Sequence, residues 1–225
     1  MILLLGDIHG DYKTLERAID LAHKSDAKAI IQVGDFGLFS GYGMANESHF
    51  RKVLTTSKVP VYFIDGNHDD CDRWLEYKEV SKVWDDANLF YVPRGTVMEL
   101  DGRTIAFMGG AASIDKKWRL IDGAHWTDKE NISPEEVLRL YENAKGKTID
   151  MYITHTPPLT VVNENFNPRD KLFFEVGLDW IDPNQNIIEH TWHYLGTPMN
   201  YSGHMHRRVQ GMTYRILDIN ELLAV

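Results

Sequence analysis

The stretch MILLLGDIHG, residues 1–10, decides the fold, because a wholly apolar run ends abruptly in a glycine, an aspartate and a histidine. Residues 2–5 (ILLL) have no polar side chain, which is typical of a strand buried on both faces of a parallel sheet. Similar runs recur at residues 29–33 (AIIQV) and 61–64 (VYFI), and residues 13–24 place apolar side chains at helical spacing. This alternation of strand and helix predicts an α/β fold with a parallel sheet covered on both faces.

The rest of the chain adds antiparallel strands. Residues 96–100 and 104–108 flank the Asp-Gly pair 101–102, which predicts a hairpin. Further strands are expected at residues 89–92, 151–154 and 199–202, and helices at residues 47–57, 134–145 and 186–195. The expected architecture is α/β, with two mixed β-sheets packed as a sandwich and flanked by helices. Residues 1–225 are expected to form a single domain, in which 159–185 is a loop-rich cap or insertion.

The composition limits the partners and the compartment. The chain has a net charge of −9, and it therefore lacks the basic character that binding to long nucleic acids or membranes requires. The lone cysteine, Cys71, excludes an intrachain disulfide and an all-thiolate zinc site. Four apolar residues after Met1 are too few for a signal-peptide core, and we expect a cytoplasmic protein with a small-molecule substrate. The sequence does not indicate an oligomeric state.

Five of the expected strands run into residues that can bind a metal ion. Because the carboxyl ends of parallel strands share one edge of a sheet, these separate clusters can converge there. The candidate ligands are Asp7, His9, Asp35, Asn67, His155, His204 and His206. Seven donors are too many for one ion and suit two ions about 3.5–4 Å apart, bridged by a carboxylate. Imidazole mixed with carboxylate and amide oxygens favours Mn, Fe, Zn, Ni or Co.

Each cluster alone has an ordinary structural explanation. The block FIDGNHDD, residues 63–70, could be a tight turn at Asp-Gly followed by a solvated acidic loop. An Asp-x-His or a Gly-Asp after a strand is common in loops of every kind. Five such clusters, all at strand ends, favour metal chemistry over turn formation.

In chain order, the blocks GDIHGD, GDFG, GNHD, THTPP and SGHMH resemble the signature motifs of the calcineurin-like metallophosphoesterases. The blocks span residues 6–206, and as a set they are highly specific. The resemblance implies a four-layer fold, with two packed sheets between layers of helices. It also implies two divalent metal ions per chain at one edge of the sheets, with manganese the first candidate.

The resemblance also assigns a role to each motif residue. Three residues, Asp7, His9 and His206, would hold the first ion. Asn67, His155 and His204 would hold the second, and Asp35 would bridge the two. His68 would be a catalytic residue, oriented by Asp69.

Residues 109–119, GGAASIDKKWR, resemble a feature of small bacterial and phage members of the same family. This resemblance leads us to expect Asp115 and Arg119 near the mouth that binds the phosphate. A surface salt pair is the alternative for these two residues. His125, next to Trp126, is expected to line the same mouth.

The implied reaction is the hydrolysis of a phosphoric ester by a water activated between two cations, with His68 donating a proton to the leaving oxygen. We expect phosphodiesters of small nucleotides as substrates, with 2′,3′-cyclic nucleotides as a candidate class. A phosphomonoesterase is a second candidate, including the protein phosphatases, which carry an arginine directly after their Asn-His-Glu block. Here the first arginine after that block is Arg73, behind an acidic run. A nuclease is a third candidate, and a non-catalytic scaffold is the least favoured one.

Overall fold

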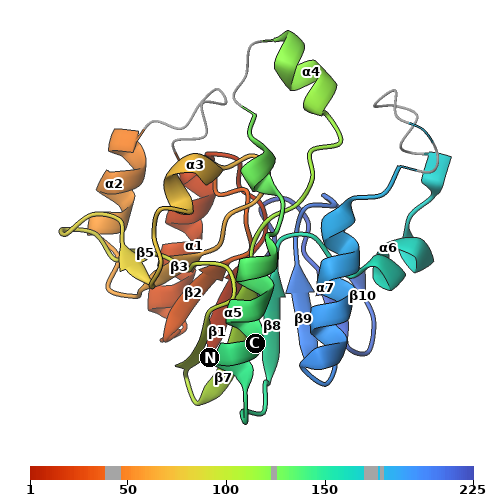
Figure 1. The fold of residues 1–225 in the computed structure, drawn as a ribbon. Coiled ribbons are helices and arrows are strands. Elements are labelled where there is room, and N and C mark those ends of the chain that lie inside the picture. Colours follow the sequence, from red (N-terminus) through yellow and green to blue (C-terminus); the bar gives the residue numbers. More distant parts are fainter. Residues whose placement is uncertain (39–46, 123–125, 170–176, 178–179) are drawn as a thin grey trace.

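A computed structural model describes residues 1–38, 47–122, 126–169, 177 and 180–225 (Figure 1). Within these residues the strands form two six-stranded sheets. The first sheet has the order β12-β1-β2-β3-β5-β4, with β1 (Ile2–Leu5), β2 (Ala29–Gln32), β3 (Val61–Phe63), β4 (Ser81–Lys82), β5 (Leu89–Tyr91) and β12 (Leu222–Ala224). The second has the order β10-β11-β9-β8-β7-β6, with β6 (Val97–Leu100), β7 (Arg103–Met108), β8 (Met151–Thr154), β9 (Met199–Ser202), β10 (Val209–Gln210) and β11 (Tyr214–Ile216).

Both sheets have the same plan, with four parallel strands in the centre and an antiparallel strand at each edge. In the first sheet β1, β2, β3 and β5 are parallel, and β12 and β4 pair antiparallel at the edges. In the second sheet β7, β8, β9 and β11 are parallel, and β6 and β10 are the antiparallel edges. The parallel centres bring the carboxyl ends of their strands to one edge of the molecule, opposite the two termini in Figure 1.

The two sheets are flanked by helices, several of which begin at a capping side chain. They are α1 (Tyr12–Lys24), α2 (Glu47–Thr55), α3 (Cys71–Trp74), α4 (Lys116–Ile121), the 3₁₀ helix η1 (Asp128–Glu130), α5 (Pro134–Ala144), α6 (Leu159–Asn165) and α7 (Pro183–Tyr194). The Asp11 carboxylate accepts the first N–H groups of α1. Ser133 and Glu136 form a reciprocal capping box on α5, directly around Pro134. These caps satisfy N–H groups that have no partner inside a helix.

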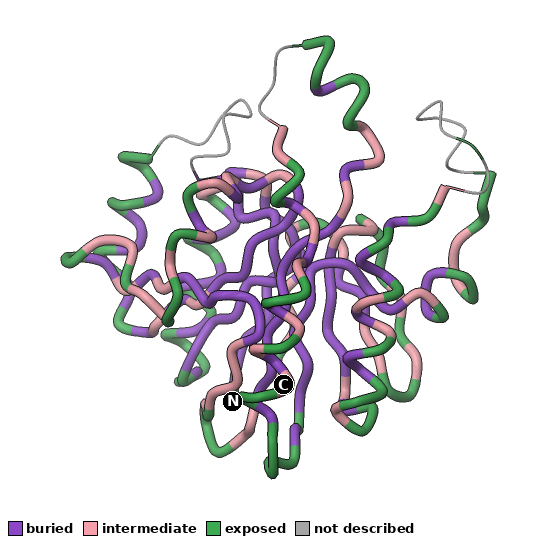
Figure 2. The backbone as a smooth tube through the Cα atoms, in the orientation of Figure 1, coloured by how far each residue is buried: buried purple, intermediate pink, exposed green. Residues whose placement is uncertain are grey.

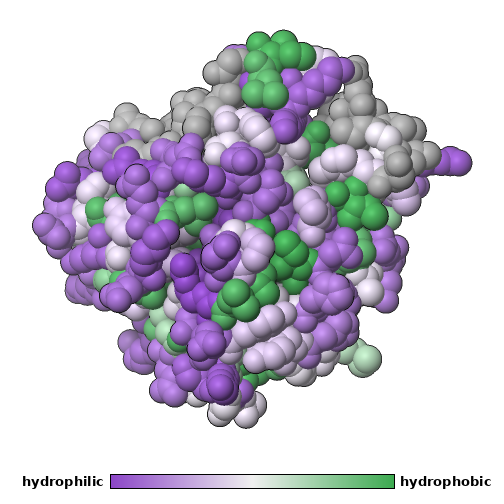
Figure 3. All heavy atoms as spheres, in the orientation of Figure 1, coloured by the Kyte–Doolittle hydropathy of each residue, from purple (hydrophilic) through white to green (hydrophobic). Residues whose placement is uncertain are grey.

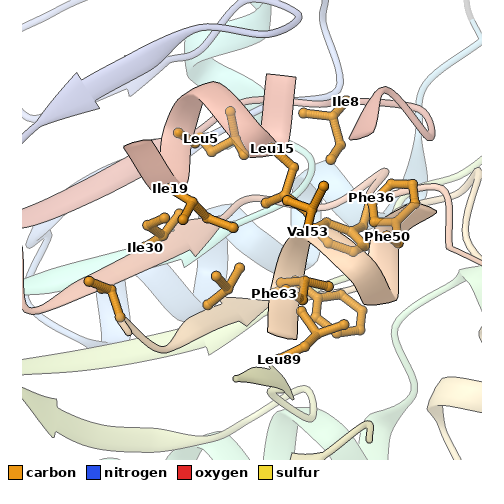
Figure 4. Packing of buried hydrophobic residues seen from close by; sticks show 14 of the residues in the cluster. Leu5, Ile8, Leu15, Ile19, Ile30, Phe36, Phe50, Val53, Phe63 and Leu89 are labelled. Atoms are coloured by element: carbon orange, nitrogen blue, oxygen red, sulfur yellow. The ribbon is translucent and has the colours of Figure 1, made fainter. Parts of the chain in front are cut away.

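Three apolar clusters separate the four layers of the fold. Alternate residues of a strand point to opposite faces, so Ile2 and Leu4 of β1 pack between the sheets, whereas Leu3 and Leu5 face the helices. The outer cluster over the first sheet holds α1 and α2 against the strands (Figure 4). A third cluster, which includes Trp192, lies between the second sheet and helices α5 and α7. Figure 2 shows the result as a buried centre with exposed helical flanks.

The expected fold class of two packed mixed sheets between helices is confirmed. Parts of the segment 159–185 differ from the expected loop. It begins with α6, and α7 starts at Pro183 rather than at 186, because Asp182 accepts a hydrogen bond from the Asn184 N–H and caps the helix. Residues 170–176 and 178–179 lie outside the described residues. The prediction that 159–185 forms a cap or insertion thus stays a prediction.

Helix α4 stands at the edge where the strands end. It exposes Leu120 and Ile121, and in Figure 3 a hydrophobic group lies at the tip of the molecule, where Figure 1 places this helix. Arg119 is the buried residue of α4. Its side chain is therefore what fastens this helix to the body of the protein. None of the described helices is long and apolar enough to cross a bilayer.

A buried ion pair lies below this edge, between residues that follow β3 and β5. Arg94 and Asp65 are both 0% exposed, and the Arg94 guanidinium donates to one Asp65 oxygen from Nε at 3.0 Å and from Nη2 at 2.6 Å. The other oxygen accepts from the Tyr91 hydroxyl at 2.8 Å. Arg94 also donates to Glu136 of the capping box and to the Glu130 carbonyl. Such a group is stable when buried only because each charged atom has a partner.

We expect Arg94→Met to lower the free energy of unfolding by roughly 3–5 kcal/mol, because it leaves the Asp65 carboxylate buried without its cation. Equilibrium unfolding in urea measures the change. The matched control is Arg51→Met, which breaks an Arg–Asp pair to Asp86 whose side chains are 50% and 52% exposed. That pair is expected to contribute far less, because water screens exposed charges. Equal losses in the two variants would contradict a special role for the buried pair.

Candidate metal centre

The predicted ligands converge at the edge where the parallel strands end. One group of Asp7, His9, Asp35 and His206 and a second group of Asp35, His155 and His204 each place their ligand atoms within 4.8 Å of one another. Asp35 belongs to both groups. Asn67 joins the second, since its Oδ1 lies 3.2 Å from His155 Nε2. The structure thus brings together all seven residues that the strand ends indicated.

Asp35 lies between the two groups in the position of a bridging ligand. Its Oδ1 accepts a hydrogen bond from the His68 N–H at 2.8 Å. Its Oδ2 lies 3.9 Å from His9 Nε2 and 3.4 Å from His155 Nε2. Within the described residues this buried oxygen has no hydrogen bond of good geometry. A buried carboxylate oxygen flanked by imidazoles is a fit for a metal ion, which would supply the missing partner.

The remaining donors of the first group link the loop after β1 to the loop after β9. Asp7 accepts the His204 N–H with both oxygens, and its Oδ2 lies 3.3 Å from His206 Nε2. His9 Nε2 and His206 Nε2 are 3.0 Å apart, a spacing that a hydrogen bond allows only when one ring carries the proton. Two ring nitrogens aimed at one point equally suit a shared cation.

Two glycines allow this close approach. A Cβ at Gly66 would lie 2.2 Å from Asp35 Oδ1, and a Cβ at Gly203 would lie 2.0 Å from Asp7 Oδ1. Either side chain would collide with a candidate ligand. The glycines in the GNHD and SGHMH blocks are therefore required by the space around the carboxylates.

Burial and charge set the protonation of these groups. Burial alone would raise the pKa of Asp35, but the neighbouring His155 and His68 hold it well below its usual range. Burial opposes the protonated form of His155, yet the Asp35 carboxylate outweighs it and raises the pKa of His155 to about 10. Burial lowers the pKa of His204 well below its ordinary value. A cation that binds between Asp35 and His155 would displace the proton held there.

A buried polar network holds Asn67 from behind. Ser113 Oγ lies 3.3 Å from Asn67 Nδ2, which donates to it, and it donates in turn to Glu130 Oε2 at 2.6 Å. The Arg119 guanidinium donates to the Asn67 carbonyl at 2.7 Å and to Ser113 Oγ at 2.5 Å. With its Nδ2 engaged by Ser113, the Asn67 side chain presents its Oδ1 to the metal site. Ser113 and Glu130 were not anticipated, because nothing in the local sequence marks a serine or a glutamate as a partner of Asn67.

Arg119 corrects the expectation that it lies at the phosphate-binding mouth or in a surface pair. Only 2% of the residue is exposed, and its Nη1 lies 3.7 Å from Glu130 Oε2. Its guanidinium is thus engaged by buried protein groups rather than facing the solvent. Asp115 does line the cleft next to the ligands, and its Oδ2 lies 3.9 Å from His68 Nε2. His125 lies outside the described residues.

Asp69 also differs from its expected role of orienting His68. Its carboxylate accepts hydrogen bonds from the N–H groups of Phe36, Gly37 and Gly66, at 2.7–3.2 Å. These contacts tie the loop that carries Asp35 to the loop that carries Asn67. Burial, and then the Asp35 charge, raise the pKa of Asp69 to about 7, while the N–H groups of Gly37 and Gly66 act in the opposite direction.

A cleft of about 600 Å³ opens beside the ligands. Apolar residues from α6 and from the segment before α7 contribute to its lining. Its polar lining residues include Asp35, Asn67, His68, Asp115, Asp182, His204, His206 and Arg207. Asp182 is fully buried, and its Oδ2 lies 4.0 Å from His204 Nε2. A substrate in this cleft would therefore lie against the predicted ligands.

Comparison with known proteins identifies the family of this chain. The calcineurin-like phosphoesterase model matches residues 1–208, and the chain belongs to that family. Membership in this family indicates a hydrolase that acts on phosphoric esters. Proteins of the family typically depend on two metal ions. The resemblance in the sequence motifs is thereby confirmed. No curated protein matches the chain.

Solved structures show the same fold at low sequence identity. The crystal structure of TT1561 of Thermus thermophilus is 14% identical with a TM-score of 0.56, over 97% of this chain and 89% of that one. A second crystal structure is 12% identical with a TM-score of 0.53, over 96% and 89%. At such identity the likeness supports the fold alone.

We expect Asp35→Asn to lower the metal content of protein purified with Mn²⁺ to less than half of the wild-type value, because both groups of ligands lose their shared carboxylate. Inductively coupled plasma mass spectrometry measures the content. Asp70→Asn is the control, since Asp70 caps α3 through the Arg73 N–H and lies outside both groups. Unchanged metal content in Asp35→Asn would contradict the bridging role.

Proposed function

We propose that this protein is a metal-dependent phosphodiesterase that hydrolyses small nucleotide diesters, with 2′,3′-cyclic nucleotides among the candidates. The observation that carries the proposal is the cleft of about 600 Å³ that lies directly on the predicted ligands and His68. A volume of this order suits a ligand of nucleotide size, because small-molecule sites typically measure about 300–1,000 Å³. Divalent ions, with manganese the first candidate, would be held by the two groups of ligands and would supply Lewis-acid chemistry at the phosphoryl group.

The charge of the cleft favours a diester over a monoester. Apart from the metal ligand Asp35, whose charge the ions would offset, Asp115 and Asp182 are the acidic groups among the described lining residues, and Arg207 is the one arginine or lysine. A diester carries one negative charge, whereas a monoester carries up to two near neutral pH. The single charge meets less repulsion from these carboxylates. The chain's net charge of −9 similarly disfavours long polyanions such as nucleic acids.

His68 is the residue that we propose to act on the leaving group. It follows ligand Asn67 directly, its side chain is 22% exposed, and it lines the cleft. Its ring stands edge-on to His9 with 5.3 Å between centroids, and its Nε2 faces the Asp115 carboxylate. In this position the imidazole can donate a proton to a leaving oxygen, and Asp115 can orient the ring.

The substrate class is tested by one panel with Mn²⁺ present. We expect bis-p-nitrophenyl phosphate to be hydrolysed faster than p-nitrophenyl phosphate. The panel then compares the hydrolysis rates of 2′,3′-cyclic nucleotides with those of their 3′,5′ isomers. Faster hydrolysis of the monoester would replace the diesterase proposal with a phosphomonoesterase. No turnover of either ester in protein that holds its metal would favour the non-catalytic scaffold.

We expect His68→Ala to retain the metal but to lose at least about 100-fold in kcat on an alkyl ester, in the range that general acids contribute. The loss is expected to be smaller with p-nitrophenolate as the leaving group, because this anion needs little protonation. Stopped-time assays with the two ester types measure the contrast, and metal analysis is the control. Wild-type rates on the alkyl ester would exclude His68 as the acid.

A further inference from the structure

Part of the wall of the cleft is apolar. Val162 and Phe166 come from α6 and its end, and Ile181 comes from the segment before α7. Val162 is buried, Phe166 is half-buried, and Ile181 is 46% exposed. Apolar side chains contribute nothing to the binding of a phosphoryl group. They suit the organic part of an ester whose phosphorus lies at the metal ligands.

Gln185 adds an unpartnered polar group to this wall. It lines the cleft and is only 5% exposed, yet within the described residues its carboxamide makes no hydrogen bond. Its neighbour Asn184 shows the contrast, since that carboxamide accepts from the Ile132 N–H and donates to Asp182 and Asn131. The Gln185 amide is not among the enclosed polar atoms that lack a partner, so it is open to the cleft and can hydrogen-bond to a molecule there. A ligand bound in the cleft would lie within reach of the Gln185 carboxamide.

Phe166 offers an aromatic surface at the same wall. Its N–H donates to Val162 at the end of α6, and it packs against the apolar cluster under the second sheet. The Arg207 guanidinium lies over the ring, 5.6 Å from its centroid. An aromatic ring fixed by the core and accompanied by a cation suits stacking with a flat, electron-rich ring.

We propose that this wall, formed by Val162, Phe166, Ile181 and Gln185, binds the heteroaromatic base of the substrate. The base would stack on the apolar side chains, and its edge would hydrogen-bond to the Gln185 carboxamide. A carboxamide has a donor beside an acceptor, and it matches a base with the same arrangement, as adenine has. This inference rests on the proposed function, because it assumes that the phosphorus lies at the metal ligands.

Calorimetric binding to the Mn²⁺-loaded protein tests the subsite without turnover. We expect adenosine 5′-monophosphate to bind at least about 10-fold more tightly than methyl phosphate, since stacking on an aromatic side chain strengthens the binding of a base. Phe166→Leu keeps an apolar residue for the core but removes the ring. Gln185→Leu keeps the volume but removes the amide.

Both variants should weaken the nucleotide by about 5- to 10-fold and leave methyl phosphate unchanged. Asn186→Ala is the matched control, because Asn186 is the next residue of α7 and is exposed. If Gln185 were only structural, Gln185→Leu would leave the affinity for the nucleotide at the wild-type value, which would overturn its role. Equal affinity of the wild type for the two ligands would overturn the whole subsite.

These outcomes are separate from those of the hydrolysis panel. Diester hydrolysis without a preference for the nucleotide would remove the subsite and leave the proposed activity. Tight, Phe166-dependent nucleotide binding in a protein that hydrolyses only monoesters would keep the subsite and replace the activity.

Discussion

The buried ion pair between Arg94 and Asp65 is the interaction on which the arrangement at the strand ends depends. Asp65 follows β3 in the first sheet, and its carbonyl also accepts the Gly110 N–H from the loop after β7 in the second. Because Arg94 is bound at the same time to Glu136 and the Glu130 carbonyl, one guanidinium connects the segment after β3 with α5 and η1. Taking these charges out of water is unfavourable, and the pair is stable only in the one arrangement that satisfies every atom. It therefore sets the relative position of the loops that follow β3 and β7.

The relative position of these two loops also fixes the position of the predicted metal ligand Asn67. Gly66 and Asn67 follow Asp65 in the chain, whereas Ser113 belongs to the loop after β7. Ser113 and Glu130 then meet Asn67 through the hydrogen bonds that orient its amide. Ligands on loops are precise only when the loops have partners that fix them, and here those partners are buried and charged. The acidic chain thus uses its few buried cations as supports of the site rather than as substrate contacts.

The sequence predicted the features that depend on a local pattern of residues. Apolar runs located the strands, and the residues just beyond them located the ligands, because a parallel sheet gathers strand ends at one edge. Ser133 and Pro134 marked the start of α5 in the same way. The roles of Asp65 and Arg119 could not be predicted, since their partners lie 29 and 52 positions away in the chain. An Asp-Gly that reads as a turn and an arginine that reads as a surface residue became buried anchors only in the folded chain.

The backbone at the ligands gives a final indication that the site is formed by the fold itself. His9, Asp35, His204 and His206 have positive φ values of 43°, 55°, 65° and 48°, in a region that residues with a side chain rarely adopt. Each such conformation costs on the order of 1–3 kcal/mol and persists only when its surroundings impose it. The His9 N–H donates to the Asp35 carbonyl, and the His204 N–H donates to Asp7, so the strained residues restrain one another. Glycine would relieve the strain at any of these positions but would remove a ligand. The donors are therefore held in place by the polypeptide itself, because hydrogen bonds between the loops impose these backbone conformations.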